Sequence, residues 1–118
     1  MIAMGAMIYK DGKFLADILQ LTTVTPTTVA VQAVNTVALN SNVERKYVRI
    51  ANLSATYPVY LSLGPPAEVS KGIYLGVAPA AGQPGGVWTM LCKDFLYTGP
   101  ITAIANGGIA NISVIEGT

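Results

Sequence analysis

Side chains able to act in acid–base or nucleophilic catalysis are scarce, because the 118 residues include no His, one Cys and six acidic residues. A serine nucleophile needs a neighbouring base, and the adjacent Ser70 and Lys71 point apart in an extended segment. Cys92 has no His to activate it, so we expect a packed thiol. Asp94 and Glu116 are better explained as solubilising charges at strand ends than as a hydrolytic pair. The sequence therefore predicts a protein that is not an enzyme.

Metal and phosphate sites are equally unsupported by the sequence. Structural zinc takes four Cys or His ligands, and this chain offers one. Asp11 and Asp17 lack the surrounding oxygen-rich loop of a calcium site. The glycine-rich residues 82–86 are not followed by a helix, which a phosphate-binding loop requires. We therefore expect no metal and no cofactor.

The charge balance limits the kinds of partner. The net charge is +1 and 11% of the residues are charged, against about 25% in typical globular proteins. Arg45, Lys46 and Arg49 form the one basic cluster, which lacks the aromatic interleaving of a single-strand binder, and we expect it to flank a strand in solvent. No apolar stretch reaches the roughly 18 residues of a transmembrane helix. We expect neither nucleic acid nor a membrane as a partner.

Short apolar runs separated by turn residues predict that the chain is built from strands. Between residues 21 and 30, Pro26 restricts the chain to an edge strand or an extended linker, because proline cannot donate to a ladder. The runs at 59–61 and 73–75 echo each other as two paired strands would, and the gap between the last two runs suits a hairpin. The expected strands cover residues 28–39, 47–53, 59–63, 73–77, 87–91, 94–97, 101–105 and 109–116.

This pattern predicts the fold class. Turn signals every 8–12 residues are typical of all-β domains. We therefore expect an all-β fold, either a small two-sheet sandwich or a jelly-roll-like barrel of about eight short strands, with an N-terminal arm or hairpin. Residues 1–20 would form the arm and residues 21–118 the sandwich domain. The alternation of side chains places ten residues in the inner layer: Val29, Val31, Val48, Ile50, Val59, Leu61, Ile73, Leu75, Ile112 and Val114.

The N-terminus is apolar from Met1 to Tyr9 and lacks the basic start of a signal peptide. Asp11-Gly12 between apolar runs predicts a hairpin over residues 6–18, and a short helix over 13–20 is the alternative. Their apolar content indicates an arm that docks on something, such as a neighbouring subunit. The candidate interface residues are Met1, Ile2, Met4, Met7, Ile8, Tyr9, Phe14, Leu15 and Ile18.

Sugar binding is a further possibility that the sequence leaves open. Jelly-roll domains include lectins, and sugars stack on exposed aromatic rings. Trp88 and Tyr97, with Gln83 on the preceding loop, are the candidate stacking residues. The alternative, which we favour, is that Trp88 packs against the sandwich or an interface.

Several strand and turn segments resemble a pattern found in small virion proteins of tailed phages. The similarity covers about residues 24–117, and the N-terminal 20 residues lie outside it. It implies a β-sandwich head or tail structural protein with no catalytic residues. The segments that carry it are RKYVRIANLS at 45–54, VYLSLG at 59–64, KGIYL at 71–75, YTGPITAI at 97–104 and residues 110–116.

Composition and resemblance together predict a non-enzymatic virion protein. So few charges indicate either a compact Ala- and Gly-rich domain or a surface that partners cover, and we favour the second explanation. The leading hypothesis is a capsid decoration or cementing protein located in the virion, a homo-oligomer with a trimer favoured, contacting the major capsid protein or another virion protein. The alternatives are a tail, connector or fibre-base component and a carbohydrate-binding module for host attachment.

Overall fold

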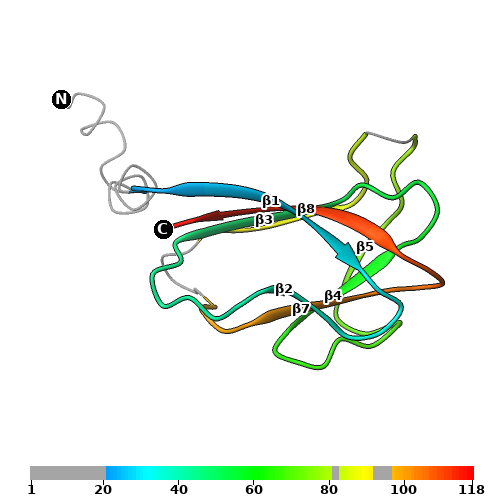
Figure 1. Ribbon diagram of the computed structural model, residues 1–118, viewed down its shortest axis with the longest axis horizontal. Coiled ribbons are helices and arrows are strands. Elements are labelled where there is room, and N and C mark those ends of the chain that lie inside the picture. Colours follow the sequence, from blue (N-terminus) through cyan, green and yellow to red (C-terminus); the bar gives the residue numbers. More distant parts are fainter. Residues whose placement is uncertain (1–20, 81–82, 92–96) are drawn as a thin grey trace.

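The computed structural model describes residues 21–80, 83–91 and 97–118, and the chain is all-β in these ranges (Figure 1). They contain no helix long and apolar enough to cross a membrane. The predicted fold class is confirmed. The strands are β1 (Val24–Val31), β2 (Thr36–Leu39), β3 (Tyr47–Asn52), β4 (Val59–Leu63), β5 (Ile73–Leu75), β6 (Val87–Leu91), β7 (Ile101–Ala105) and β8 (Ala110–Gly117).

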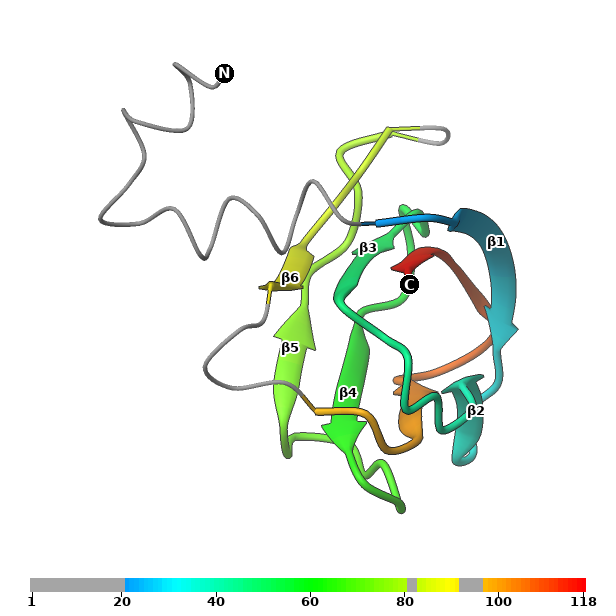
Figure 2. The ribbon, with the colours of Figure 1, turned by 90° about the vertical axis from the view of Figure 1, so that its left-hand side faces the viewer.

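The strands form two antiparallel four-stranded sheets that pack face to face (Figure 1 and Figure 2). Sheet A has the order β1-β8-β3-β6, and sheet B has the order β2-β7-β4-β5. The first strand pairs with the last, β2 with β7, β3 with β6 and β4 with β5. This nested pairing is that of a long hairpin wound into a double-sheet jelly roll. The sandwich and the jelly roll, both expected from the sequence, are thus one architecture here.

The core lies between the sheets and contains the predicted inner layer. Alternation turns every second side chain of a strand inward, so Val48 and Ile50 of β3 meet the core while their neighbours face outward. Eight of the ten predicted residues are buried in the core, and Val29 and Ile73 are partly buried against it. Each fully buried aliphatic side chain contributes roughly 1.5–3 kcal/mol of transfer free energy. β7 adds residues that the sequence analysis did not select: Ile101, Ala103 and Ala105.

Strand β1 shows how proline is accommodated in this sheet. β1 is the outer strand of sheet A, and Pro26 lies opposite Ile115 in its pairing with β8. A proline is tolerated on such an edge because one side of the strand has no ladder to complete. The edge-strand interpretation of this segment is therefore confirmed, and the strand begins at Val24 rather than at Thr28.

The pairing of neighbouring strands gave one correct prediction and one wrong one. β4 and β5 pair as expected, with Tyr60 opposite Tyr74. The hairpin expected between the last two strands does not form, because β7 lies in sheet B and β8 in sheet A. The β7–β8 connection, with Gly107 at φ +119°, crosses between the sheets instead. A glycine-rich turn fits either connection, so the local sequence could not distinguish them.

Two sequence predictions fall partly or wholly outside the described residues. The N-terminal arm, its hairpin over 6–18 and its alternative helix over 13–20 lie outside them, so the division at residue 20 stays a prediction. The strand expected over 94–97 also lies outside them except for Tyr97, which is not in a strand.

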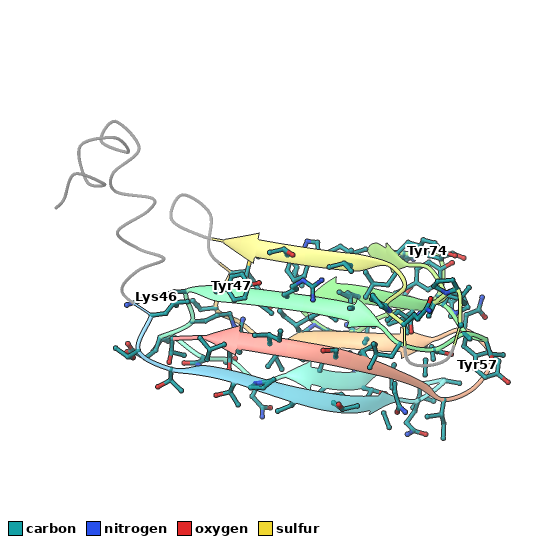
Figure 3. All side chains as sticks on the ribbon, turned by 90° about the horizontal axis from the view of Figure 1, so that it is seen from above. Lys46, Tyr47, Tyr57 and Tyr74 are labelled. Carbon is teal, nitrogen blue, oxygen red and sulfur yellow. The ribbon has the colours of Figure 1, made fainter. Side chains whose placement is uncertain are left out.

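The sandwich has two distinct ends, at which different connections gather. Lys46 and Tyr47 lie at one end, and Tyr57 and Tyr74 lie at the other (Figure 3). The first and last residues of the described sandwich lie together at the end that holds Lys46 and Tyr47, since Thr22 N–H donates to Thr118 O at 2.7 Å. We call this the entry end and the opposite one the far end.

Candidate functional site

Arg45 is completely buried at the entry end, which corrects the expectation of a solvent-exposed basic cluster. Its Nε donates to Glu116 Oε2 at 2.8 Å. Its Nη1 donates to the carbonyl oxygens of Tyr97 and Gly99, at 3.0 and 2.9 Å. Its Nη2 donates to Asn40 O at 2.7 Å. Glu116 is therefore an ion-pair partner, with its side chain 19% exposed, and not a simple solubilising charge at a strand end.

The Arg45 contacts join three parts of the chain into one rigid end. They tie the β2–β3 connection to β8 and to the segment that precedes β7. The planar guanidinium can serve several acceptors at once, which the single ammonium of a lysine cannot match. An ion pair whose remaining hydrogen-bond groups are also satisfied is the form in which a buried charge is tolerated. Arg45 thus has a structural role, and its guanidinium is not available to an external anion.

Asn52, the last residue of β3, has the corresponding role toward the far end. It is completely buried, and its Nδ2 donates to the carbonyl oxygens of Tyr57, Leu75 and Gly76 at 3.0–3.2 Å. Its Oδ1 accepts from Ser54 N at 2.9 Å. The side chain joins sheet A to the connections on both sides of the β4–β5 pair. The sequence alone does not indicate this role, because the partners at Leu75 and Gly76 are remote in the chain.

Charged residues are nearly absent from the strands. Within the eight described strands, only β3 and β8 contain one, Arg49 and Glu116. Glu116 faces Arg45 inside the molecule. Glu68 and Lys71 form an exposed ion pair at 3.0 Å in the β4–β5 connection, away from the strands. The two outer faces of the sandwich therefore carry a single described charge, Arg49.

The outer face of sheet A is the side seen in Figure 3. Apolar and small polar side chains cover it, with Val24 53% and Val87 42% exposed. Ile115 lies near its centre, between Pro26 of β1 and Arg49 of β3. Strand register assigns thirteen described residues to this face: Val24, Pro26, Thr28, Ala30, Tyr47, Arg49, Ala51, Val87, Thr89, Asn111, Ser113, Ile115 and Gly117.

Leu21 rests on this outer face at the entry end. A Cβ built on Gly117 would lie 3.1 Å from Leu21 Cδ2 and 3.2 Å from Tyr47 Cβ. Gly117 and Tyr47 are opposite each other in the β3–β8 register, so both face outward. The absent side chain of Gly117 therefore leaves the space that Leu21 occupies beside Tyr47. We call Leu21, Tyr47 and Gly117 the entry seat.

The outer face of sheet B is different, because a loop covers part of it. By register it comprises Val37, Tyr60, Ser62, Tyr74, Thr102 and Ile104. The β4–β5 connection reaches the start of β2, where Ala67 N–H donates to Asn35 Oδ1 at 2.6 Å. Thr102 is buried on this side, and its Oγ1 has no hydrogen-bond partner among the described residues.

An aromatic pair remains open on sheet B. The rings of Tyr60 and Tyr74 have centroids 5.3 Å apart and are tilted by 54°, an arrangement that aromatic pairs prefer over a face-to-face sandwich. Tyr74 is 58% exposed, and it lies at the far end in Figure 3. The sequence analysis noted these tyrosines only as evidence for strand pairing. The sequence signal for their exposure is that both alternate with the apolar residues Val59, Leu61 and Leu75, and so face the opposite side of the sheet.

Trp88 and Tyr97, the sequence candidates for ligand stacking, both pack against the core. Each is a partly buried residue beside the core cluster, and Trp88 lies opposite Ile50 in the β3–β6 pairing. The Tyr97 hydroxyl donates to Pro100 O at 2.8 Å. This placement agrees with the packing alternative for Trp88. The structure does not bring the two rings together as one platform, and sugar binding through them stays a prediction.

The described residues contain no cluster of three or more His, Cys, Asp or Glu side chains that could hold a metal ion. Compared with protein-family models, curated proteins and solved structures, the chain gives no match. The resemblance to phage structural proteins therefore stays a prediction from the sequence pattern. The functional argument depends on the surface just described.

Proposed function

We propose that this protein is a non-enzymatic structural subunit of a tailed-phage virion, most specifically a decoration or cementing protein on an icosahedral head. The observation that carries the proposal is the near absence of charge from both outer faces of the sandwich. The partner would be the major capsid protein or another virion protein. The protein would act as a homo-oligomer, with a trimer favoured.

The exposed apolar side chains support a covered surface. An antiparallel sheet that faces water normally alternates inward apolar residues with outward polar ones. Here the outward positions include Val37, 51% exposed, and Tyr74, 58% exposed, with no charged neighbour in the strands of sheet B. Contacts between symmetric copies, or with a shell, remove such surface from water. Few charged groups then have to be removed from water on assembly.

The rigid ends of the sandwich also suit a structural role. Arg45 and Asn52 fix the connections through buried hydrogen bonds rather than leaving them to rearrange. A subunit whose shape is fixed before assembly loses less conformational freedom on binding. Cementing proteins need this property because many copies must fit one shell geometry.

The test is the copy number of this chain in gradient-purified particles, measured by quantitative mass spectrometry against the major shell protein. A ratio near one to one, or a simple fraction that follows shell symmetry, supports decoration. A handful of copies per particle overturns decoration in favour of a tail, connector or fibre-base component. Absence from particles overturns the virion proposal as a whole.

A carbohydrate-binding module is the second candidate, and the observation that favours it is the Tyr60–Tyr74 pair, in which Tyr74 is exposed. Aromatic rings on a sheet surface can stack on sugar faces. The test is a glycan screen with the wild-type protein and the Tyr74→Ala variant. Binding that is lost in Tyr74→Ala supports this function, whereas a screen without hits contradicts it. Trp88→Ala is a poor probe because Trp88 packs against the core.

A further inference from the structure

We infer that the outer face of sheet A is the docking surface for residues 1–20 of a neighbouring copy of this chain. The inference rests on the proposed structural function and names the partner and the face through which copies join. Three observations support it: the position of Leu21, the side chains on the outer face of sheet A, and the length of residues 1–20.

The described part of the chain begins on the face in question. The β1–β8 pairing is extended by Thr22 N–H donating to Thr118 O and by Thr118 N–H donating to Thr23 O, at 2.7 and 2.8 Å. Leu21 then lies on the outward side, in the entry seat beside Tyr47 and above Gly117. The first described residue, Leu21, therefore lies on the outer face of sheet A, and not in the core or on sheet B.

The chemistry of the face matches that segment. The face exposes Val24 and Val87 and has Ile115 near its centre, and residues 1–20 contain ten large apolar side chains, counting Tyr9. The one described charge of the face is Arg49. The two acidic and two basic side chains of residues 1–20 balance, so the match between segment and face is apolar rather than ionic. Burial of this apolar area is the favourable contribution that must outweigh the costs of association.

The segment is long enough to reach a neighbouring copy. Twenty extended residues span about 66 Å at roughly 3.3 Å per residue, whereas β1 and β8 have eight residues each and span about 27 Å on the same basis. A segment that leaves the entry seat can thus cross its own sheet and still reach another subunit. Exchange of identical segments is a low-cost route to symmetric oligomers.

The first test uses full-length variants and their mass by sedimentation velocity. Ile115→Glu places a carboxylate at the centre of the face, and Thr28→Glu does so at an exposed position of β1. We expect both variants to be monomers under conditions in which the wild type is an oligomer. Tyr74→Glu, at an exposed position on sheet B, is the matched control and should remain oligomeric. If Ile115→Glu fails to fold, Thr28→Glu still tests the same face.

The second test asks whose segment occupies the face. Lys46 lies beside the entry seat (Figure 3), and the segment contains Lys10 and Lys13. Light and heavy-isotope chains are mixed, reassembled and treated with an amine cross-linker. We expect peptides that join Lys46 of one isotope to Lys10 or Lys13 of the other. Cross-links confined to one isotope would show docking within a chain and overturn the inference.

Other outcomes are equally decisive. A monomeric wild type, or oligomers that persist in both Thr28→Glu and Ile115→Glu, overturns the docking surface. Loss of the oligomer in Tyr74→Glu with retention in the sheet A variants moves the interface to sheet B and also overturns it. The copy-number measurement is independent of these results. If the docking tests fail but the copy number follows shell symmetry, the proposed function still holds. If the protein is absent from particles, the proposed function is excluded, and the docking surface is judged by the oligomer tests alone.

Discussion

At the scale of single residues, two buried polar side chains carry much of the specificity of this fold. Arg45 and Asn52 each contact parts of the chain that are distant in sequence, up to 71 residues apart for Arg45 and Glu116. Neither can be replaced by an apolar residue without leaving backbone carbonyls unpaired in the interior. The cost of such orphaned groups, more than the strength of each bond, is what makes these positions sensitive.

We predict that Arg45→Met lowers the free energy of unfolding by about 3–5 kcal/mol, because it leaves the Glu116 carboxylate without its partner. Three carbonyl oxygens also lose their donor. Urea denaturation followed by circular dichroism measures the change. Lys46→Met is the matched control, since Lys46 forms no ion pair among the described residues, and it should change the unfolding free energy by less than about 0.5 kcal/mol. Equal effects of the two substitutions would contradict this role for Arg45.

We predict that Asn52→Asp lowers the free energy of unfolding by more than about 2 kcal/mol, because an acceptor replaces the donor that faces three carbonyl oxygens. The same substitution at the exposed Asn106 serves as control and should be nearly neutral. Both variants are compared by thermal and urea denaturation at neutral pH. A stable Asn52→Asp protein would show that the far-end connections do not depend on this amide.

At the scale of elements, sheet B depends on cross-strand contacts that compensate for its short strands. β5 has only three residues and pairs with β4 alone in the described sheet. The Tyr60–Tyr74 contact joins these two strands on the outer side, while Val59 and Leu75 join them on the inner side. Cross-strand pairs of this kind are the unit from which sheets gain stability.

We predict that a double-mutant cycle of Tyr60→Ala and Tyr74→Ala gives a coupling energy of about 0.5–1 kcal/mol, as expected for an aromatic cross-strand pair. Each single variant should retain the fold, because both rings lie outside the core cluster. The cycle is measured from urea unfolding of the four proteins. Additive effects, with no coupling, would mean that the two rings contribute independently of their contact.

The contribution of residues 1–20 is tested at the same scale, because the described sandwich has its own core. We predict that deletion of residues 1–18 leaves the domain folded and abolishes assembly. Circular dichroism reports the fold, and sedimentation velocity reports the assembly. If deletion instead abolished the cooperative unfolding transition, the segment would be part of the core and not an arm.

At the scale of the whole molecule, the distribution of charge decides how copies can meet. The net charge of +1 gives almost no long-range repulsion between copies. The outer faces present apolar and small polar groups, with Arg49 as their one described charge. Association between such faces gains from apolar burial and owes little to attraction between charges.

We predict that the oligomer of the wild-type protein depends little on ionic strength, with its dissociation constant changing by less than about threefold between 0.05 and 0.5 M NaCl, because screening weakens only contacts between charges. The heat-capacity change of association should be negative, as burial of apolar surface requires. Sedimentation equilibrium and isothermal dilution calorimetry measure the two quantities. A steep loss of the oligomer with salt would show that ion pairs hold the copies together.

Features that depend on a few consecutive residues could be predicted from the sequence alone. Alternation and turn residues predicted most of the strands and the inward residues such as Val48 and Leu61, because both signals lie within a few consecutive positions. Residues 28–39, expected as one strand, are divided between β1 and β2 of different sheets. Proline chemistry gave the edge position of β1 in the same way. These predictions needed no knowledge of which strands meet.

Only the tertiary structure decided which remote groups meet. It placed β7 and β8 in different sheets, turned Arg45 inward onto Glu116 and packed Trp88 against the core. It also left Tyr74 exposed and set Leu21 above Gly117. Each of these outcomes depends on pairing between distant segments, which a local pattern of residue types does not encode. The surface that we propose as the site of assembly therefore became visible only once the two sheets were in place.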